Sequence, residues 1–147
     1  MAIDLGTTTV VLEVVHMESG EVVYQASFGN PQRFGGSDVM HRISYDGGPF
    51  RGELHKAAVA AVNRVLKDAC RTLGMDRHEI QEMMVAGNST MRDLFFGLDV
   101  KALGRLPFKS TGEVTLDNLL RQLPGLVRRR RQPHREANLK ADGGDAR

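Results

Sequence analysis

The sequence predicts an α/β fold in which a three-stranded meander is followed by a helix, a further strand and a second helix. Three features point to this fold. Short apolar segments separated by turn residues occupy residues 1–28, apolar side chains recur at helical spacing over 50–73, and another apolar segment at 82–86 precedes a further helical stretch. The chain of 147 residues is long enough for one modest domain with its own core.

Three strands are expected at 2–5, 9–16 and 20–28. The first two flank a turn that is rich in hydroxyl groups, and the last two meet at a tight turn with the sequence Glu18-Ser19-Gly20-Glu21. Strands joined by such short turns pair antiparallel, so these three are expected to form a meander.

Residues 29–49 are rich in glycine, asparagine, proline and aspartate, and most of them are expected to be irregular. A short helical segment is predicted at 38–43, with Ser37 as its N-cap. One long amphipathic helix follows over 50–73 and ends at Gly74. Its apolar stripe consists of Leu54, Ala58, Ala61, Val62, Val65, Leu66, Ala69 and Leu73.

A fourth strand is predicted at 82–86, where a nearly continuous apolar segment indicates that the strand is largely buried. Gly87 and Asn88 then lead into a helix over 89–96. Methionine fills irregular gaps in cores. The methionines expected to do so here are Met83, Met84 and Met91.

The turn between the first two strands has the composition of a phosphate-binding loop. Asp4 ends the first strand, and Gly6, Thr7, Thr8 and Thr9 follow it. Such a turn presents backbone N–H groups and hydroxyls to an anion, with Gly6 supplying any positive φ that the turn requires. Asp4 can hold a hydrated Mg²⁺ ion or orient a water molecule. The alternative is a threonine-rich hairpin that carries an aspartate by chance.

The pattern from Asp4 to Thr9 resembles the first phosphate motif of the actin, sugar-kinase and heat-shock-chaperone ATPase superfamily, whose halves are each built on a ribonuclease-H-like sheet. Three later segments resemble one branch of it, the ATP-dependent reductive activators of corrinoid proteins and corrinoid-dependent methyltransferases. In that family a [2Fe-2S] ferredoxin-like domain is joined to a nucleotide-binding domain that drives electron transfer and returns cobalt(II) corrinoid to cobalt(I). The three segments are 29–32 with 37–43, 84–91, and 103–108.

The resemblance implies a ribonuclease-H-like mixed sheet with flanking helices, in which the fourth strand lies beside the first and parallel to it. It covers about residues 1–108, which would be the first half of an actin-type ATPase domain. The chain therefore resembles a fragment, with 109–127 as an incomplete continuation and 128–147 as a basic, disordered tail.

The resemblance also implies that the cofactors are ATP and Mg²⁺. Asn88 and Ser89 are expected to arrive close to Asp4, where the free N–H groups of a helix N-terminus stabilise an anion. Asp4 and Asn88 are the candidate catalytic residues, and Asp4 is the expected Mg²⁺ ligand, through water. Alternatively, Asn88 only caps its helix and Thr90 fills the first turn. The expected nucleotide-binding residues are Asp4, Gly6, Thr7, Thr8, Thr9, Gly87, Asn88, Ser89 and Thr90.

Cysteine content and hydropathy bear on further cofactors and on the compartment. Cys70 is the single cysteine, so this chain lacks the roughly four ligands that a [2Fe-2S] cluster needs and cannot form an intrachain disulfide. A buried structural thiol is expected at this helical position. A reducing compartment fits such cysteine usage, and no apolar run reaches the length of a membrane span, so a cytoplasmic protein without a membrane partner is expected.

Two other functions are disfavoured. A ribonuclease-H-type nuclease needs clustered carboxylates, and Asn88 stands where a third acid would join Asp4 and Glu53. Four arginines at 128–131 can bind a phosphate backbone, but no aromatic residues are interleaved with them. Nucleic acid is therefore not the expected partner.

Three interpretations of the function remain, of which a basic nucleic-acid binder is the least favoured. The first is a partial ATP-binding domain of a corrinoid activator, with a corrinoid protein or methyltransferase as partner and weak or no ATP hydrolysis by this chain alone. The second is an inactive truncated fragment, or a non-catalytic interaction module that pairs with a separate second ATPase half through an exposed apolar surface. The residues expected on that surface are Leu94, Phe95, Phe96 and Leu98.

Overall fold

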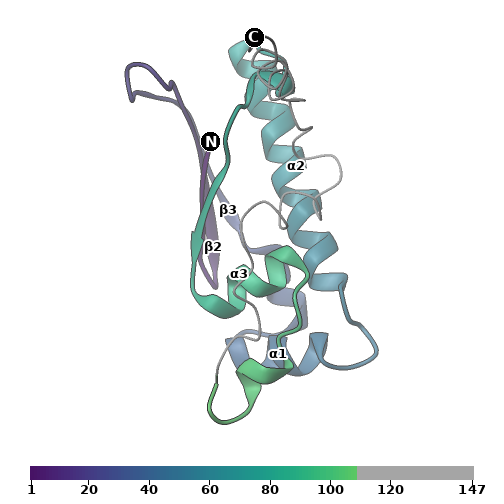
Figure 1. Ribbon diagram of the computed structural model, residues 1–147. Coiled ribbons are helices and arrows are strands. Elements are labelled where there is room, and N and C mark those ends of the chain that lie inside the picture. The colour runs from purple at the N-terminus through teal and green to yellow at the C-terminus, as the bar shows by residue number, and fades with distance from the viewer. Residues whose placement is uncertain (109–147) are drawn as a thin grey trace, which may run out of the picture.

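The computed structural model describes residues 1–108, which form a four-stranded mixed sheet with helices packed on one of its faces (Figure 1). The helices and strands follow the order β1, β2, β3, α1, α2, β4 and α3, with short 3₁₀ helices between some of them. The expected order of meander, helix, strand and helix is confirmed. The continuation expected at 109–127 and the tail expected at 128–147 lie outside the described residues.

The strand order in the sheet is β3-β2-β1-β4. β1 (Ala2–Leu5) pairs antiparallel with β2 (Thr9–Val15) across the β1–β2 loop (residues 6–8), and β2 pairs antiparallel with β3 (Val22–Gly29). β4 (Met84–Gly87) lies beside β1 and parallel to it, as the resemblance implied. The carboxyl ends of β1 and β4 therefore meet at the same end of the sheet.

Alternation along the strands decides which side chains enter the core. Ile3 and Leu5 of β1 are buried, whereas Asp4 between them is exposed on the opposite face of the sheet. The inward side chains pack against the apolar stripe of α2 (Glu53–Leu73), and each fully buried side chain of this size stabilises the fold by about 1.5–3 kcal/mol. Further members of this core are Val10, Leu12, Val14, Leu54, Val62, Leu66, Met91 and Leu94.

The start of α2 differs from the prediction because a turn precedes it. Residues 50–52 were expected to be helical, but Gly52 adopts the left-handed conformation at φ 84° and the helix begins at Glu53. Phe50 stacks on Tyr45 with ring centroids 4.9 Å apart, so an aromatic contact rather than a helical turn fixes this segment.

The end of α2 is as predicted. Gly74, at φ 65°, terminates the helix and donates its N–H to the Cys70 carbonyl. Cys70 packs against the core while remaining half-buried, and burial raises the pKa of its thiol. Its surroundings are those of a structural thiol rather than a reactive one.

The N-cap of α1 (Val39–Asp46) is Asp38, and the prediction of Ser37 was wrong. Asp38 Oδ1 accepts a hydrogen bond from the backbone N–H of His41 at 2.9 Å, and Oδ2 lies 2.6 Å from His41 Nδ1. Ser37 lies one residue too early for this geometry. The hydrogen bonds from the backbone and side chain of His41 lower the pKa of the Asp38 carboxyl group.

Stability is expected to depend on pH through Asp38. Because its pKa is lower in the folded state, the ionised carboxylate contributes stability above the unfolded-state value of about 3.9, and this contribution is lost as the pH falls through the folded-state value. Urea denaturation should find Asp38→Asn less stable than the wild type at about pH 6, with a difference that shrinks towards about pH 3. A difference that stays constant over this range would contradict the assignment.

β3 begins at Val22 and not at residue 20, as the sequence predicted. Gly20 has a φ of 74° and donates its N–H to the His16 carbonyl, so it belongs to the turn between β2 and β3. The predicted tight turn is therefore confirmed, and it is slightly longer at its carboxyl end than expected.

β4 is not the buried strand that the sequence predicted. Met84 is 66% exposed, and Ala86 and Gly87 are exposed as well, whereas Met83 just before the strand is buried. β4 lies at one edge of the described sheet, and the described helices cover only the face to which alternate side chains point. Of the three methionines expected in the core, Met83 and Met91 are buried and Met84 is not.

The apolar residues of α3 (Ser89–Phe96) are buried, which contradicts the expected docking surface. Leu94, Phe95 and Phe96 have exposed fractions of 1%, 0% and 5%, and Leu98 is partly buried against the same core. α3 packs on α1 and α2 at one end of the sheet (Figure 1). The exposed apolar surface that favoured an interaction module is therefore not found at these residues.

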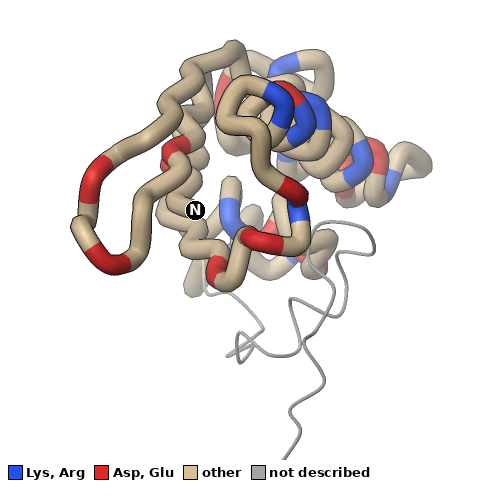
Figure 2. Tube along the Cα trace, turned by 90° about the horizontal axis from the view of Figure 1, so that it is seen from above, with Lys and Arg blue, Asp and Glu red and all other residues tan. Residues whose placement is uncertain are grey.

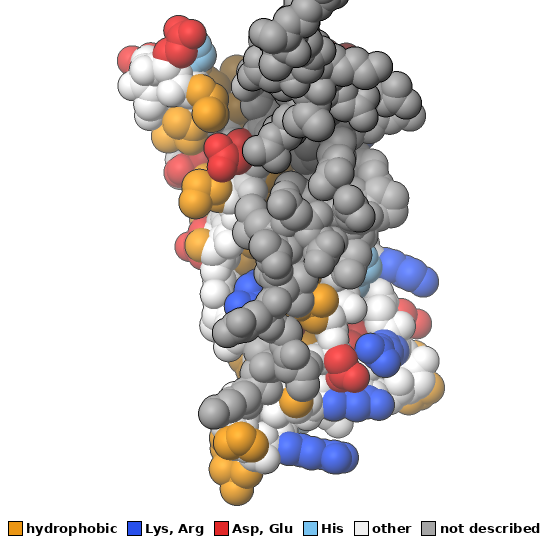
Figure 3. All heavy atoms as spheres, viewed as in Figure 1, with side chains coloured by type: hydrophobic (Ala, Val, Ile, Leu, Met, Phe, Trp, Pro, Cys, Tyr) orange, Lys and Arg blue, Asp and Glu red, His pale blue; other side chains and the backbone are white. Residues whose placement is uncertain are grey.

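The exposed surface of the described residues is mixed in character. Apolar side chains gather at the upper left of Figure 3, over the end of the β2–β3 hairpin, where Met17, Val22 and Val23 are exposed. Acidic and basic residues follow one another along the long helix α2 (Figure 2), which differs from the single basic face of a nucleic-acid binder. Within residues 1–108, no helix has both the length and the apolar character needed to cross a membrane.

Candidate functional site

The β1–β2 loop is held from its inner side by hydrogen bonds to three consecutive carbonyl groups. Asn30 Nδ2 donates to the Gly6 carbonyl and the Asn30 backbone N–H donates to the Thr8 carbonyl, both at 2.8 Å. Between them, Arg42 Nη2 donates to the Thr7 carbonyl at 2.7 Å. Because a trans peptide places its N–H opposite its C=O, the N–H groups of Thr7 and Thr8 are directed away from Asn30 and Arg42. Adjacent N–H groups on one side of a loop form an anion-binding concavity.

Gly6 is required here for space and not for a positive φ. A Cβ atom at this position would lie 2.5 Å from the backbone oxygen of Thr9, and Gly6 is not among the glycines with positive φ. The expectation that Gly6 supplies a left-handed conformation was therefore wrong. The close approach of two backbone segments explains the glycine instead.

The start of α3 lies against the same loop, as the sequence analysis expected. Gly87 is opposite Leu5 in the parallel ladder, and a Cβ atom on Gly87 would lie 2.9 Å from the Leu5 carbonyl oxygen. Asn88 Oδ1 caps α3 by accepting from the Met91 N–H at 2.9 Å, while Asn88 Nδ2 lies 3.4 Å from Thr7 Oγ1. Asn88 therefore caps its helix and also contacts the β1–β2 loop.

The hydroxyl groups differ in their access to this end of the sheet. Thr8, Thr9 and Ser89 are exposed, and Thr7 is half-buried beside Asn88. Thr90 is only 7% exposed. The structure thus places every predicted site residue near the junction of the loop and α3, but it leaves Thr90 with little surface for a ligand.

Asp4 projects from the sheet face opposite the helices. In the described part of the chain its carboxylate has no hydrogen-bond or ion-pair partner, and it is exposed. No group of three or more histidine, cysteine, aspartate or glutamate residues suited to a metal lies within 1–108. Mg²⁺ keeps several of its waters and needs only one or two carboxylates together with substrate phosphates. One free carboxylate beside an anion-binding loop fits that donor set.

A buried polar cluster beneath the loop was not predicted from the sequence. It consists of Asn30, Gln32 and Arg42, with exposed fractions of 1%, 0% and 0%. Arg42 Nη1 lies 3.1 Å from Met91 Sδ, and Asn30 Nδ2 lies 3.8 Å from the same sulfur atom. The cluster therefore ties the β1–β2 loop to α1, α3 and the segment after β3.

A signal for part of this cluster is present in the sequence. Arg42 precedes the apolar Ile43 and lies four residues before Asp46, and these three are the buried residues of α1. A cation in the inward face of a short helix indicates a buried polar contact. The identity of its partner, 35 residues away in the chain, can be read only from the structure.

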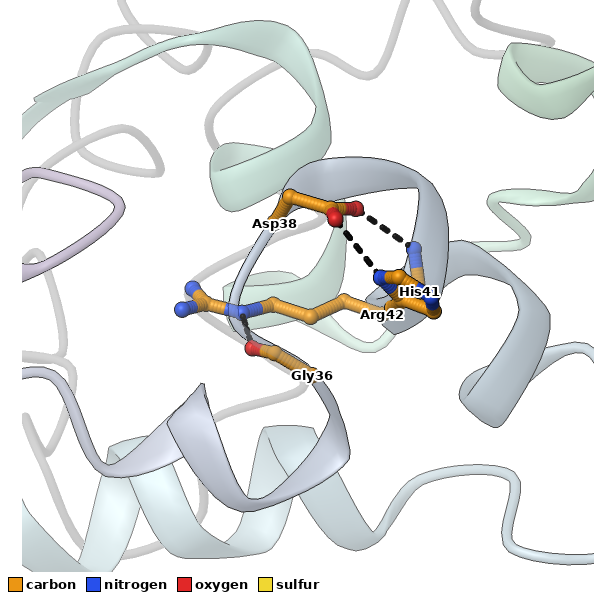
Figure 4. A network of polar contacts seen from close by, with 4 residues as sticks. All are labelled: Gly36, Asp38, His41 and Arg42. Atoms are coloured by element: carbon orange, nitrogen blue, oxygen red, sulfur yellow. Dashed lines mark hydrogen bonds and ion pairs between the residues drawn. The ribbon is translucent and has the colours of Figure 1, made fainter.

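Asp38 forms no ion pair with Arg42. Figure 4 shows the Asp38 carboxylate turned towards His41, while Arg42 extends past it and donates from Nε to the Gly36 carbonyl at 3.0 Å. Burial lowers the pKa of Arg42, nearby Arg33 lowers it further, and Asp38 opposes them. The positive charge of the cluster therefore lies behind the outward-facing N–H groups of the loop.

Comparison with known proteins gives the family of this chain. The family model described as the RACo middle region matches residues 1–122. The chain belongs to the RACo middle region family. The resemblance to reductive activators of corrinoid proteins, which the sequence motifs indicated, is thereby confirmed.

Two relatives of this RACo middle region are corrinoid activators. The corrinoid activation enzyme RamQ of Eubacterium limosum is 38% identical over an alignment of 112 residues, and the match covers 74% of this chain and 18% of RamQ. A solved structure of a reductive activator for a corrinoid, iron-sulfur protein matches with a TM-score of 0.71 and 37% identity, again over 74% of this chain and 18% of that protein. The chain spans less than a fifth of the length of either relative.

Proposed function

We propose that the described residues form the phosphate-binding part of an ATP-binding domain, and that this domain serves the ATP-dependent return of a cobalt(II) corrinoid to cobalt(I). The observation that carries the proposal is the convergence of Asp4, the β1–β2 loop and the N-terminus of α3 at one end of the sheet. The contact between Asn88 and Thr7 joins the two phosphate-binding segments. The descriptions of RamQ and of the solved activator support the corrinoid part of the proposal.

The proposed fold is the ribonuclease-H-like half of an actin-type ATPase domain, within residues 1–108. Its support is the antiparallel meander with β4 added parallel to β1, together with the helix that connects β3 to β4. In such sheets a ligand binds at the carboxyl ends of the parallel strands. The β1–β2 loop and the start of α3 both lie there.

Each predicted site residue has a proposed role towards ATP and Mg²⁺. The N–H groups of Thr7 and Thr8 bind phosphate oxygens, as do the exposed hydroxyls of Thr8, Thr9 and Ser89. The absence of a side chain at Gly6 and Gly87 lets the backbone and the ligand approach closely. Asp4 holds Mg²⁺ through water, and the ion supplies the positive charge that neutralises the phosphates. Asn88 orients a water molecule, while Thr90 supports the first turn of α3.

These residues would bind the phosphates and Mg²⁺, but none of them has an assigned contact with the base or the ribose of ATP. We therefore expect the 147-residue chain alone to hydrolyse ATP weakly or not at all. A single cysteine does not fit a [2Fe-2S] cluster, so no electron-transfer step is assigned to this chain. The proposed partners are a corrinoid protein or methyltransferase and a second ATPase half, and the proposed compartment is the reducing cytoplasm.

The proposal is tested by thermal denaturation with and without saturating Mg-ATP. A ligand at about 100 times its dissociation constant adds roughly 2.7 kcal/mol, which corresponds to a rise in Tm of about 10 °C or more for a domain of this size. Asp4→Asn removes the carboxylate that holds Mg²⁺, so the rise should become much smaller. The control is Glu18→Gln, which removes the same charge from the hairpin at the far end of β2.

The wild type and Glu18→Gln are expected to respond equally to Mg-ATP. With EDTA in place of Mg²⁺, Asp4→Asn should lose its disadvantage relative to the wild type, because without the metal ion the carboxylate only repels the phosphates. No Tm rise in the wild type at millimolar Mg-ATP would refute nucleotide binding by this chain. An equal rise in Asp4→Asn would refute the assigned role of Asp4.

A further inference from the structure

We propose that Arg42 is an electrostatic positioning residue of the phosphate site, which fixes the β1–β2 loop from below and favours ligands of higher negative charge, triphosphate over diphosphate. This inference rests on the proposed function and names a residue outside the predicted phosphate-binding set. It is carried by the position of Arg42, by its uncharged acceptors and by the absence of an ion pair to it within residues 1–108.

The side chain of Arg42 is completely buried and connects three segments of the chain. It donates from Nε to the Gly36 carbonyl at 3.0 Å and from Nη2 to the Thr7 carbonyl at 2.7 Å, and Nη1 lies 3.1 Å from Met91 Sδ. All three partners are uncharged. A guanidinium group with five N–H donors can hold such a set of acceptors in one fixed geometry.

No carboxylate within residues 1–108 forms an ion pair with Arg42. Asp38 is bonded to His41 on the exposed side of α1, and the neighbouring Arg33 adds charge of the same sign. Asp38 favours the charged form of Arg42 only from a distance, and a buried cation without an ion-pair partner costs free energy, which an anion bound nearby recovers in part. This unfavourable buried charge lies directly beneath the loop that is proposed to bind the phosphates.

The geometry links Arg42 to the ligand through one peptide group. Its Nη2 holds the carbonyl of Thr7, and the N–H of the same peptide, on Thr8, points to the opposite side. An anion that accepts from Thr8 would lie roughly 7 Å from the guanidinium group, given ordinary hydrogen-bond lengths. At that distance, with an effective dielectric constant of about 20, one unit of ligand charge changes affinity on the order of tenfold or more.

Arg42 also holds the peptide in the orientation that directs the Thr8 N–H outward. Loss of the side chain would therefore have two separable effects. Loss of positioning weakens all phosphate ligands by the same factor, whereas loss of charge weakens the more highly charged ligand more. The ratio of affinities for ATP and ADP reports the second effect when it is compared with that of a variant that disturbs the loop without changing its charge, because the two ligands share their base and ribose and differ by one charged phosphate group.

The test measures dissociation constants for ATP, ADP and AMP without Mg²⁺, by calorimetry on the 147-residue chain. Arg42→Met removes the charge and keeps an apolar stem, and Arg42→Gln removes the charge and keeps an N–H donor. Both are expected to lower the preference for ATP over ADP by about tenfold. Asn30→Ala is the matched control, because it frees the Gly6 carbonyl without changing the charge. It should weaken ATP and ADP equally and leave their ratio unchanged.

The outcomes separate this inference from the proposed function. If the wild type binds none of the three ligands without Mg²⁺ and shows no Tm rise with Mg-ATP, both fail, whereas a Tm rise with Mg-ATP but no binding without Mg²⁺ overturns this inference alone. If the wild type binds ATP but the two Arg42 variants keep the wild-type ratio, the proposed function stands and Arg42 has no electrostatic role. If neither Arg42 variant folds, as judged by circular dichroism in the presence of ATP, Arg42 is a structural requirement and the inference is overturned.

Discussion

Replacement of Phe95 by alanine is expected to destabilise the protein by about 3–5 kcal/mol, the largest effect of any single substitution considered for this fold. Phe95 is 0% exposed, and its ring meets that of Phe96 edge to face, with centroids 5.1 Å apart. The backbone carbonyl of Phe95 also lies 2.7 Å from His55 Nδ1, which joins α3 to α2. Truncation leaves a cavity where these two helices meet.

Small domains have total stabilities of about 5–15 kcal/mol, so a loss of this size leaves a substantial unfolded fraction. Urea denaturation monitored by circular dichroism measures it directly. Met84→Ala is the control, because Met84 is another large apolar residue but is 66% exposed on β4. Its effect should stay within about 0.5 kcal/mol. An equal loss of stability in the two variants would contradict the buried position of α3 and would favour the exposed docking surface that the sequence predicted.

Gly6→Ala is expected to reduce ATP affinity by about 100-fold while changing the fold little elsewhere. The added Cβ would lie 2.5 Å from the Thr9 backbone oxygen, so the β1–β2 loop must move. Asn30 and Arg42 hold the loop carbonyls on the other side and oppose that movement. The outward N–H groups of the loop then lose the geometry that binds phosphate.

The same calorimetric titration with Mg-ATP measures this loss. Gly29→Ala is the matched control, since a Cβ atom there meets no atom within 4 Å and its φ is not positive. Gly29 also lies next to Asn30, so the control tests a nearby backbone position without the clash. If Gly6→Ala binds ATP as tightly as Gly29→Ala, the loop does not provide the phosphate site.

The local pattern of the chain was sufficient to predict most elements, because helix and strand periodicity reflect which residues face a core. The apolar stripe of α2 and its end at Gly74 were predicted correctly for this reason. The boundaries that differed depend on particular caps and turns. The N-cap of α1 is Asp38 and not Ser37, and α2 begins after the segment in which Phe50 stacks on Tyr45.

Burial was predicted less well than secondary structure. The sequence segment at β4 looks like a buried strand, but its exposure depends on its place at the edge of the sheet. The apolar residues 94–96 look available for docking, but α1 and α2 already cover them. In both cases the deciding contacts are with elements far away in the chain, and no local pattern contains that information.

The candidate site divides in the same way. Asp4, the threonines and Asn88 were predicted from the sequence because a phosphate-binding loop has a local composition, and their role towards phosphate stays a prediction. Arg42 and Asn30 were not assigned roles, because their importance comes from contacts with Thr7 and Gly6 across the fold.

The order of the elements, the glycine and threonine loop after β1 and the family of the chain could all be predicted from the amino-acid sequence. The strand at the edge of the sheet, the covered apolar residues and the cation beneath the loop become known only once the chain is folded. Periodicity and turn chemistry act between neighbours in the chain. The burial of apolar and charged side chains, in contrast, depends on contacts between distant parts of the chain, such as those that bring residues 7, 42 and 91 together.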